Sequence, residues 1–456
     1  MPGEQHQMSK KRILFIHPDL GIGGAERLVV DAAVGLQQRG HTVTVYTSHC
    51  DHGHCFDEAR DGTLDVRVAG NTVIPPNLLG RFSILCAILR QLHLSLTLLL
   101  TNEISKYDYI FIDQLSAAIP LLRFFSPATK ILFYCHFPDY LLATRTSFIK
   151  SLYRIPFDWF EGFTTGLADT IAVNSAFTKS VFATAFPRIR LVPKVVYPCV
   201  TPTTTSLSKA IDNDPPFPND GRKIILSINR FERKKNIDLA ITSYSLLTRI
   251  QRCQSRLVIA GGYDTRVSEN VTYHSDLVAL CEKLGLKAAT SRNFISSLSV
   301  PEDTDVLFLL SIPAALKSYL LKTASLLVYT PAREHFGIVP LEAMIAGVPV
   351  LAHNSGGPLE TIEEGKTGWL RPADDEQWTA VMRLALFELE EKAIVEMATR
   401  GRERVLELFS KEKMAERLDG EFDEISDKRS IRGLVWTILA GLGVGIGLGT
   451  AFALRS

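Results

Sequence analysis

The sequence predicts an α/β protein with two domains, each built on a doubly wound parallel sheet, followed by a C-terminal transmembrane helix. Its 456 residues accommodate two or three domains of about 150 residues each. Strand-like and helix-like segments alternate from Arg12, and the alternation restarts at Lys223 after a polar stretch. The chain then ends in 22 residues without a charge, Gly433 to Leu454, and about 20 suffice to cross a bilayer.

The first domain, residues 1–200, opens with a βαβ unit. Arg12–His17 is a short apolar strand, a glycine-rich loop leads into a helix that ends near Gln38, and Thr42–Thr47 is a β-branched strand. Further strands alternating with helical stretches are expected at 107–113, 130–134, 169–173 and 194–197. This order predicts a parallel sheet covered by helices.

A linker separates the two domains. Residues 201–222 are rich in Thr, Ser, Pro, Asp and Asn and cannot build a core. The second domain, 223–410, has expected strands at 223–228, 256–262, 306–310, 325–329 and 348–352, with helices at 236–250 and from about 337. A C-terminal helix at 411–429 follows. Two such domains predict a ligand cleft between them, at the carboxyl ends of their strands.

The uncharged C-terminal segment predicts a membrane anchor, with a buried core helix as the alternative. Lys428, Arg429 and Arg432 precede it and only Arg455 follows it. By the positive-inside rule, the large N-terminal part of the chain should lie in the cytosol.

Two internal segments are also apolar. Residues 78–100 contain Arg81, Arg90 and His93, which make a membrane-spanning helix costly, so an amphipathic helix is expected. Residues 148–163, which include Trp159, have a similar character. Periodicity leaves open whether either helix packs in the core or lies on a membrane surface.

Composition excludes several classes of protein. The 50 Lys and Arg balance 49 Asp and Glu, unlike the basic excess of a nucleic-acid binder. Seven cysteines without CxxC spacing indicate a reducing compartment. The His49–Cys55 segment is crowded with His and Cys but lacks zinc-site spacing, so a loop lining an acceptor site is favoured over a metal site.

A glycine-rich loop follows the first strand. Gly23 and Gly24 lie where backbone N–H groups and a helix N-terminus can receive a phosphate. Glu26 occupies the third position of the GxGxxG pattern, so a nicotinamide cofactor is not expected. A tight βα turn without a ligand is the alternative.

A second group of candidate residues lies in the second domain. Arg230 and Lys235 follow its first strand and can hold a diphosphate. Glu334 and Glu342 have E-x7-E spacing, and Glu342 can accept hydrogen bonds from a ribose. The amides of Phe336, Gly337 and Ile338 should open a helix and offer an anion site.

These motifs together resemble retaining glycosyltransferases of the two-Rossmann-domain GT-B class. The shared features are GGAER, R-x4-KN at 230–236, E-x3-G-x3-LEAM-x2-G-x-PV at 334–350 and GG-x2-E at 356–360. The segments at 49–58, 134–139 and 174–178 are more narrowly similar to the α-1,3/1,6-mannosyltransferases of dolichol-linked oligosaccharide synthesis. That family transfers mannose from GDP-mannose to Man-GlcNAc2-diphosphodolichol on the cytosolic face of the endoplasmic reticulum.

The resemblance implies a role for each matching residue. Arg230 and Lys235 would contact the donor diphosphate, Glu334 the mannose hydroxyls and Glu342 the guanosine ribose. Gly23 and Gly24 would approach the diphosphate from the first domain, and His136 would lie over the sugar, where it can stabilise an oxocarbenium-like transition state. No metal is expected, because side chains and helix amides neutralise the leaving group.

The resemblance implies as partners GDP-mannose, a dolichol-diphosphate-linked oligosaccharide, the endoplasmic reticulum membrane and a complex with other early-pathway mannosyltransferases. No nucleic acid is among them. Two alternatives stay open at this stage: a membrane-anchored GT-B hexosyltransferase that uses a UDP-sugar, and a non-catalytic scaffold subunit.

Overall fold

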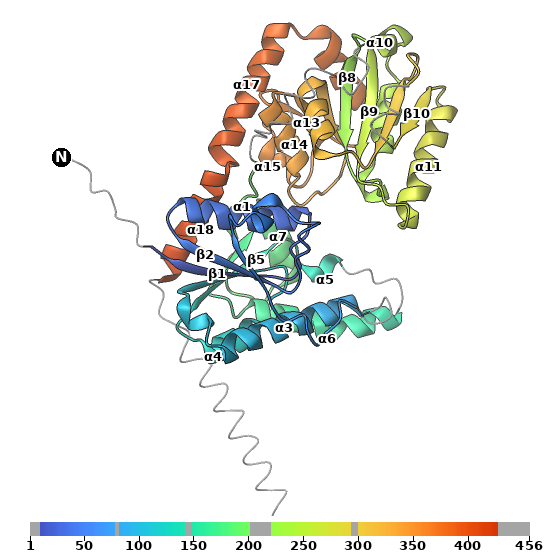
Figure 1. The fold of residues 1–456 in the computed structure, drawn as a ribbon. Helices are drawn as coiled ribbons and strands as arrows, with labels where there is room; N and C mark the ends of the chain where they lie inside the picture. The colour runs from blue at the N-terminus through green and yellow to red at the C-terminus, as the bar shows by residue number, and fades with distance from the viewer. Residues whose placement is uncertain (1–9, 78–81, 143–147, 201–219, 293–299, 427–456) are drawn as a thin grey trace, which may run out of the picture. The chain divides into compact units, whose positions relative to one another are not determined.

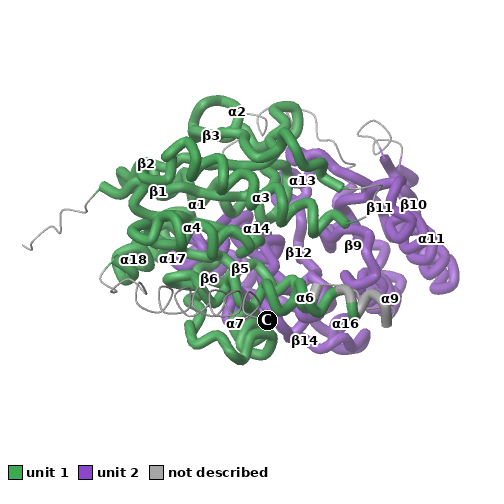
Figure 2. The backbone as a smooth tube through the Cα atoms, turned by 90° about the horizontal axis from the view of Figure 1, so that it is seen from below, with its two compact units in different colours: residues 1–174, 178–197, 411–456 green, residues 175–177, 198–410 purple. Residues whose placement is uncertain are grey.

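A computed structural model describes residues 10–77, 82–142, 148–200, 220–292 and 300–426. They form two compact units (Figure 2): unit 1 comprises the described residues of 1–174, 178–197 and 411–456, and unit 2 those of 175–177 and 198–410. Each unit contains one seven-stranded parallel sheet, which confirms the predicted α/β class. The expected transmembrane helix at 433–454 and most of the expected linker lie outside the described residues.

The sheet of unit 1 has the strand order β3-β2-β1-β4-β5-β6-β7. Its strands are β1 (Arg12–His17), β2 (Thr42–Thr47), β3 (Asp65–Val68), β4 (Tyr109–Asp113), β5 (Lys130–Cys135), β6 (Thr170–Val173) and β7 (Lys194–Val195). Its helices are α1 (Gly24–Gln38), α2 (Asp57–Arg60), α3 (Ser83–Leu100), η1 (Ile104–Lys106), α4 (Ile119–Phe125), α5 (Asp139–Leu142), α6 (Phe148–Thr165), α7 (Ala176–Ala185, which begins in unit 2) and α18 (Lys411–Ser426).

The sheet of unit 2 has the order β10-β11-β9-β8-β12-β13-β14. Its strands are β8 (Lys223–Ile228), β9 (Ser255–Gly261), β10 (Ala288–Ser291), β11 (Val306–Leu310), β12 (Ala324–Tyr329), β13 (Val350–His353) and β14 (Gly368–Arg371). Its helices are η2 (Arg233–Lys235), α9 (Asp238–Ser245), α10 (Arg249–Cys253), α11 (Ser268–Lys283), α13 (Ala314–Thr323), α14 (Ile338–Ala346), α15 (Pro358–Thr361), α16 (Asp375–Arg383), η3 (Leu384–Glu388) and α17 (Glu391–Leu408).

Side chains alternate across the sheet of unit 1 and build a core on each face. On one face, Leu14, Ile110 and Phe133 pack with Leu94 of α3 and Phe182 of α7. The opposite face carries stacked aromatic rings of β1, β4 and β5 and is covered by α1 and α18 (Figure 1). Helices on both faces explain why the strands are apolar on both sides.

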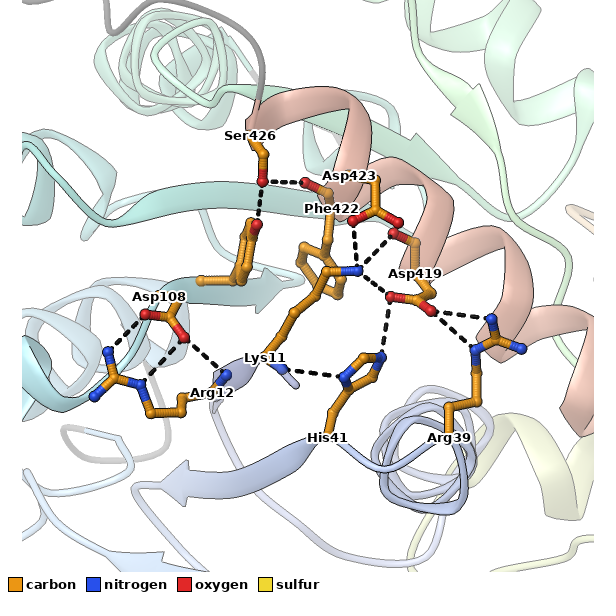
Figure 3. A network of polar contacts seen from close by, with 10 residues as sticks. Lys11, Arg12, Arg39, His41, Asp108, Asp419, Phe422, Asp423 and Ser426 are labelled. Atoms are coloured by element: carbon orange, nitrogen blue, oxygen red, sulfur yellow. Dashed lines mark hydrogen bonds and ion pairs between the residues drawn. The ribbon is translucent and has the colours of Figure 1, made fainter. Parts of the chain in front are cut away.

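The C-terminal helix α18 packs onto unit 1 through a buried polar network (Figure 3). Asp419 of α18 forms an ion pair with Lys11 and accepts a hydrogen bond from Arg39 Nε at 3.0 Å. His41 Nδ1 accepts from the Lys11 backbone N–H at 3.2 Å, which leaves Nε2, 3.0 Å from Asp419, to carry the proton. Two cationic side chains, Lys11 and Arg39, therefore compensate the charge of a carboxylate that is almost fully buried, and the His41 ring lies against it.

Each sheet has a central point where its strand order reverses direction. In unit 1 this point lies between β1 and β4, and in unit 2 between β8 and β12, which pair in parallel. The loops at the carboxyl ends of such a strand pair diverge and leave a crevice, where ligands of open α/β sheets bind.

Candidate active site

The switch point of unit 2 brings together two of the predicted site residues. Lys235 follows β8 and Glu334 follows β12, and Lys235 Nζ lies 2.6 Å from Glu334 Oε2. Both side chains are largely shielded, with 12% and 22% of their surface exposed. Thr330, buried after β12, donates a hydrogen bond of 2.6 Å to the Lys235 carbonyl and so fixes its backbone. A cation and a carboxylate are thus held side by side where a ligand is expected.

Two glycines hold the loop that carries Glu334. The Gly357 N–H donates to the Glu334 carbonyl at 2.8 Å. Gly356 has a φ of +70°, which favours glycine, and a Cβ there would lie 2.4 Å from the Glu334 carbonyl oxygen. A Cβ on Gly357 would lie 2.0 Å from the Phe336 carbonyl oxygen. The paired glycines are therefore required by close backbone packing against this loop.

The helix expected near residue 337 begins at Ile338, after Gly337 with a φ of +85°. Phe336 is buried, and its ring packs against Phe409 at 5.8 Å between centroids. Burial, together with the carboxylates of Glu334 and Glu342, raises the pKa of the Tyr329 hydroxyl well above its usual value. Tyr329 therefore stays a neutral hydrogen-bond donor beside these glutamates.

The other two predicted donor residues have different partners. Arg230 is 63% exposed and pairs with Glu232 at 3.0 Å, whereas Lys235 pairs with Glu334. Glu342 of α14 pairs with Lys317 of α13 at 2.6 Å. These exposed or half-exposed ion pairs contribute little stability.

In unit 1, three polar side chains meet at the carboxyl ends of β1, β4 and β5. Asp113 is fully buried and accepts from His17 Nδ1 at 2.8 Å and from His136 Nε2 at 3.0 Å. His17 is buried as well, whereas His136 is 21% exposed. Asn174 donates to the His136 carbonyl at 3.0 Å. Asp113 is therefore the bridge that orients His136 at the surface of this site.

Hydrogen bonding defines the charge of this cluster. The other ring nitrogen of His17, Nε2, lies 3.1 Å from the Asp19 carbonyl, which can only accept. Both nitrogens of His17 therefore donate. Burial opposes the charge on His17, but Asp113 outweighs it and the pKa of His17 is raised. Burial likewise opposes the Asp113 carboxylate, yet the two histidines lower its pKa overall.

The predicted phosphate loop of unit 1 opens α1 as expected. A Cβ on Gly23 would lie 2.2 Å from Glu26 Oε2, whereas one on Gly24 would meet nothing within 4 Å. The Glu26 carboxylate therefore lies at the N-terminal end of α1, where the helix dipole favours a negative charge. A phosphate would have to displace this side chain.

Two family models match the chain in succession. Residues 22–201 match the model described as Glycosyltransferase Family 4, and residues 208–404 match Glycosyl transferases group 1. A curated relative, alpha-1,3/1,6-mannosyltransferase alg-2 of Neurospora crassa, is 56% identical over 91% of this chain and 90% of its own. Its counterpart ALG2 of Saccharomyces cerevisiae is 46% identical over 92% of this chain and 86% of its own.

The chain belongs to the α-1,3/1,6-mannosyltransferases.

Solved structures agree with this fold. A sucrose-phosphate synthase from Thermosynechococcus elongatus superposes with a TM-score of 0.67 at 18% identity, covering 91% of this mannosyltransferase and 99% of the synthase. A glycosyltransferase from Rickettsia africae superposes with a TM-score of 0.66 at 16% identity, covering 92% of this chain and 100% of its own. At these identities the likeness concerns the fold alone. The resemblance to α-1,3/1,6-mannosyltransferases is confirmed by the curated relatives, and with it mannosyl transfer.

Sequence reasoning missed two residues of the unit 1 cluster in this mannosyltransferase. His17 and Asp113 end two predicted strands, and we interpreted them only as strand ends. A polar residue as the last member of an otherwise apolar central strand is the signal that could have found them, because the carboxyl ends of parallel strands converge.

The loop with clustered His and Cys lies near this site. His49 lines a cavity of about 540 Å³ together with Asp19 and Arg90. Burial, and then the Cys55 thiol, raise the pKa of Cys50 to about 11. Within the described ranges, no group of three or more His, Cys, Asp or Glu is arranged to hold a metal ion.

Proposed function

We propose that this mannosyltransferase takes mannose from GDP-mannose and adds it to Man-GlcNAc2-diphosphodolichol, first in α-1,3 and then in α-1,6 linkage, with retention of configuration. The observation that carries the proposal is the Lys235–Glu334 pair at the switch point of unit 2. A carboxylate can bind sugar hydroxyls while the adjacent ammonium binds the departing diphosphate. The family of the curated relatives supports the type of sugar transferred.

In this mechanism the bond between the mannose C1 and the donor diphosphate breaks, and a bond from C1 to the acceptor hydroxyl forms on the same face. The acceptor proton passes to the leaving diphosphate, which departs as GDP. Arg230 and Lys235 would bind the diphosphate, with the backbone N–H groups of Phe336, Gly337 and Ile338 at the start of α14. No metal takes part in this proposal.

Two residues would contact other parts of the substrates. Glu342 is proposed to leave Lys317 and accept from the ribose hydroxyls, and His136 to contact the sugar as its positive charge develops. Gly23 and Gly24 stay predicted diphosphate contacts of unit 1. The open space beside Gly24 is compatible with that role, provided that Glu26 moves aside.

The proposed location is the endoplasmic reticulum membrane, with the catalytic domains facing the cytosol. The basic residues before the C-terminal uncharged segment support this topology. Among the described helices, α3 alone is long and apolar enough to cross a membrane, and a third of it is buried. Because Arg90 of α3 donates to the Ser48 carbonyl at 2.8 Å and is itself buried, we interpret α3 as packed on the sheet. A complex with other mannosyltransferases of the pathway stays a prediction.

The test is calorimetric titration of the purified full-length enzyme with GDP, UDP, GDP-mannose and UDP-glucose, followed by a transfer assay with a phytanyl-diphosphate-linked Man-GlcNAc2. We expect guanosine ligands to bind and mannose to be transferred twice. Preference for UDP-sugars would indicate a different hexosyltransferase. Binding without transfer would indicate a scaffold subunit.

A further inference from the structure

An apolar groove of about 670 Å³ in unit 1 has no role in the site described above. Its walls are α6 and the segment that follows α7. The apolar lining includes Trp159, Phe163, Phe186, Ile189 and Leu191. A volume of this size suits a small-molecule ligand.

Two of the aromatic side chains that line the groove are unusually exposed to solvent. Trp159 and Phe163 are 63% and 48% exposed, and their rings stack at 5.4 Å with an interplanar angle of 2°. Apolar surface of this kind is costly to leave in water and marks an interaction site.

Two arginines at one side of the groove indicate the charge of its ligand. Arg188 and Arg190 line the groove and are exposed, and neither forms an ion pair with another described residue. The groove's acidic residue, Asp158, pairs with Arg154 at 3.0 Å, and Arg154 also pairs with Asp139 at 2.7 Å, so the two arginines exceed the one acidic residue that lines the groove. The combination of an apolar wall and two available guanidinium groups fits an apolar chain that ends in a phosphate or diphosphate.

Helix α6 connects the groove to the loop that carries His136. Residues 158, 159, 162 and 163 of α6, and Gly166 directly after it, line the groove. Glu161, between them, instead accepts from the backbone N–H groups of Asp139 and Tyr140 at 2.8 and 2.9 Å. These two residues begin α5, directly after the His136 loop. A ligand in the groove therefore lies against the helix that holds the loop of the proposed sugar site.

We propose that this groove binds the polyisoprenoid chain of the lipid-linked acceptor, with Arg188 and Arg190 contacting its diphosphate. This inference rests on the proposed lipid acceptor. The chain's own uncharged C-terminal segment is a poorer occupant, because Lys428, Arg429, Arg432 and Arg455 flank it and would be repelled by the two arginines.

The experiment compares two acceptors with the same sugars and diphosphate, one on a phytanyl chain and one on a short, water-soluble alkyl chain. The double variant Trp159→Ser/Phe163→Ser should raise the KM for the phytanyl acceptor at least tenfold, and leave the KM for the short-chain acceptor and for the donor unchanged. Arg188→Ala/Arg190→Ala should raise the KM for both acceptors, since both carry the diphosphate.

Matched controls come from α6 and from α7, the helix that precedes the segment with the two arginines. Ile155→Ser removes an α6 side chain that is 59% exposed but outside the groove, and Lys179→Ala removes a charge from α7 outside it. Equal effects of the control and groove variants would overturn the inference in favour of a general membrane contact. Unchanged KM values in the groove variants would also overturn it.

Phytanyl diphosphate without sugar provides a binding test that is independent of transfer. Full-length enzyme should bind it at least tenfold more tightly than either groove variant does. If deleting 433–454 tightened its binding tenfold, the C-terminal segment would be the occupant and the inference would be wrong. If wild-type enzyme bound the probe in the groove yet transferred no mannose, the proposed function would fail while the groove assignment stood.

Discussion

The Lys235 side chain is only 12% exposed, so its charge acts mainly on the groups in direct contact with it. Its Nζ contacts Glu334, and its backbone is held by Thr330. Lys235→Ala should remove a charge-assisted contact to the leaving diphosphate, and lower kcat/KM by an amount equivalent to about 2–4 kcal/mol. Single-turnover transfer from GDP-mannose measures this loss.

Lys234→Ala is the matched control for that substitution. Lys234 is 66% exposed and pairs with Glu232, so its loss should leave kcat/KM nearly unchanged. A Lys235→Ala enzyme that transfers both mannoses at the wild-type rate would refute the donor assignment.

Asp113 determines how stability depends on pH at the His17 cluster. The pKa of His17 is raised in the folded protein, which stabilises the fold. This stabilisation is complete below the pKa of an unfolded histidine, about 6.5, and is lost as the pH rises through the higher pKa of the folded state. The lowered pKa of Asp113 contributes stability above about pH 4 and loses it at lower pH. The pair should therefore stabilise unit 1 most between about pH 4 and 6.5.

Asp113→Asn should accordingly cost about 3 kcal/mol of unfolding free energy at pH 5, because it leaves His17 buried without its counter-charge. The cost should shrink towards pH 8, where the variant's His17 is neutral. Urea unfolding at pH 5 and at pH 8 measures this loss of unfolding free energy. Asp108→Asn, which disrupts an exposed pair with Arg12, should cost less than about 1 kcal/mol and show no such trend.

At the scale of elements, Asp419 is the most buried charged group that holds α18 against the rest of unit 1. Asp419→Asn should destabilise unit 1 by roughly 3 kcal/mol, because Lys11 would stay buried and lose its buried counter-charge. Thermal unfolding and proteolysis near 411–426 report the loss. Asp423 also pairs with Lys11 but is 65% exposed, so Asp423→Asn should cost less than about 1 kcal/mol.

The Glu334 loop gives a second prediction at this scale. Gly357→Ala should push the Phe336 carbonyl aside, cost about 1–3 kcal/mol of stability and raise the donor KM at least tenfold. Gly420→Ala in α18 meets nothing within 4 Å and should be neutral or slightly stabilising. A donor KM that is the same for the two variants would argue against a role for this loop in donor binding.

Element prediction from sequence succeeded where a strand lies inside its sheet. The expected strands 12–17, 42–47, 223–228 and 306–310 have the observed bounds. The sequence analysis did not identify β3, β10 and β14. These are four-residue strands at sheet edges, and they are less completely buried than β6 and β13 of the same length, so they lack a continuous apolar run. The helix expected at 236–250 is two helices, α9 and α10, because a capping box at Thr248 starts a new one.

For the whole molecule, the C-terminal uncharged segment should hold the enzyme at the membrane rather than contribute to folding. Deleting 433–454 should leave the unfolding free energy and GDP binding unchanged, because every described catalytic candidate lies before it. Transfer to a lipid-linked acceptor in vesicles should fall at least tenfold, since enzyme and acceptor no longer share the membrane. Equal activity of both forms on vesicles would contradict this role.

Topology can be measured on the same preparation. Protease added outside sealed microsomes should cleave the body of the protein. Asn270 forms part of a glycosylation sequon but is buried, and its amide donates to the Phe231 carbonyl at 3.0 Å, so we expect no glycan there. Protection from protease, or glycan at Asn270, would place the catalytic domains in the lumen and refute the use of a cytosolic donor.

The sequence alone determined the α/β class, the restart of the βα alternation in a second unit, and the family, because periodicity and motif spacing are local properties that a linear chain displays. It also placed Lys235 after the first strand of the second domain and Glu334 in a loop before a helix. The tertiary structure decided that these two pair with each other while Arg230 and Glu342 have other partners. It likewise decided that Asp113 joins His17 to His136, and that α18 packs on unit 1. Such contacts join residues up to several hundred positions apart, and they depend on which strands become neighbours, which no local pattern encodes.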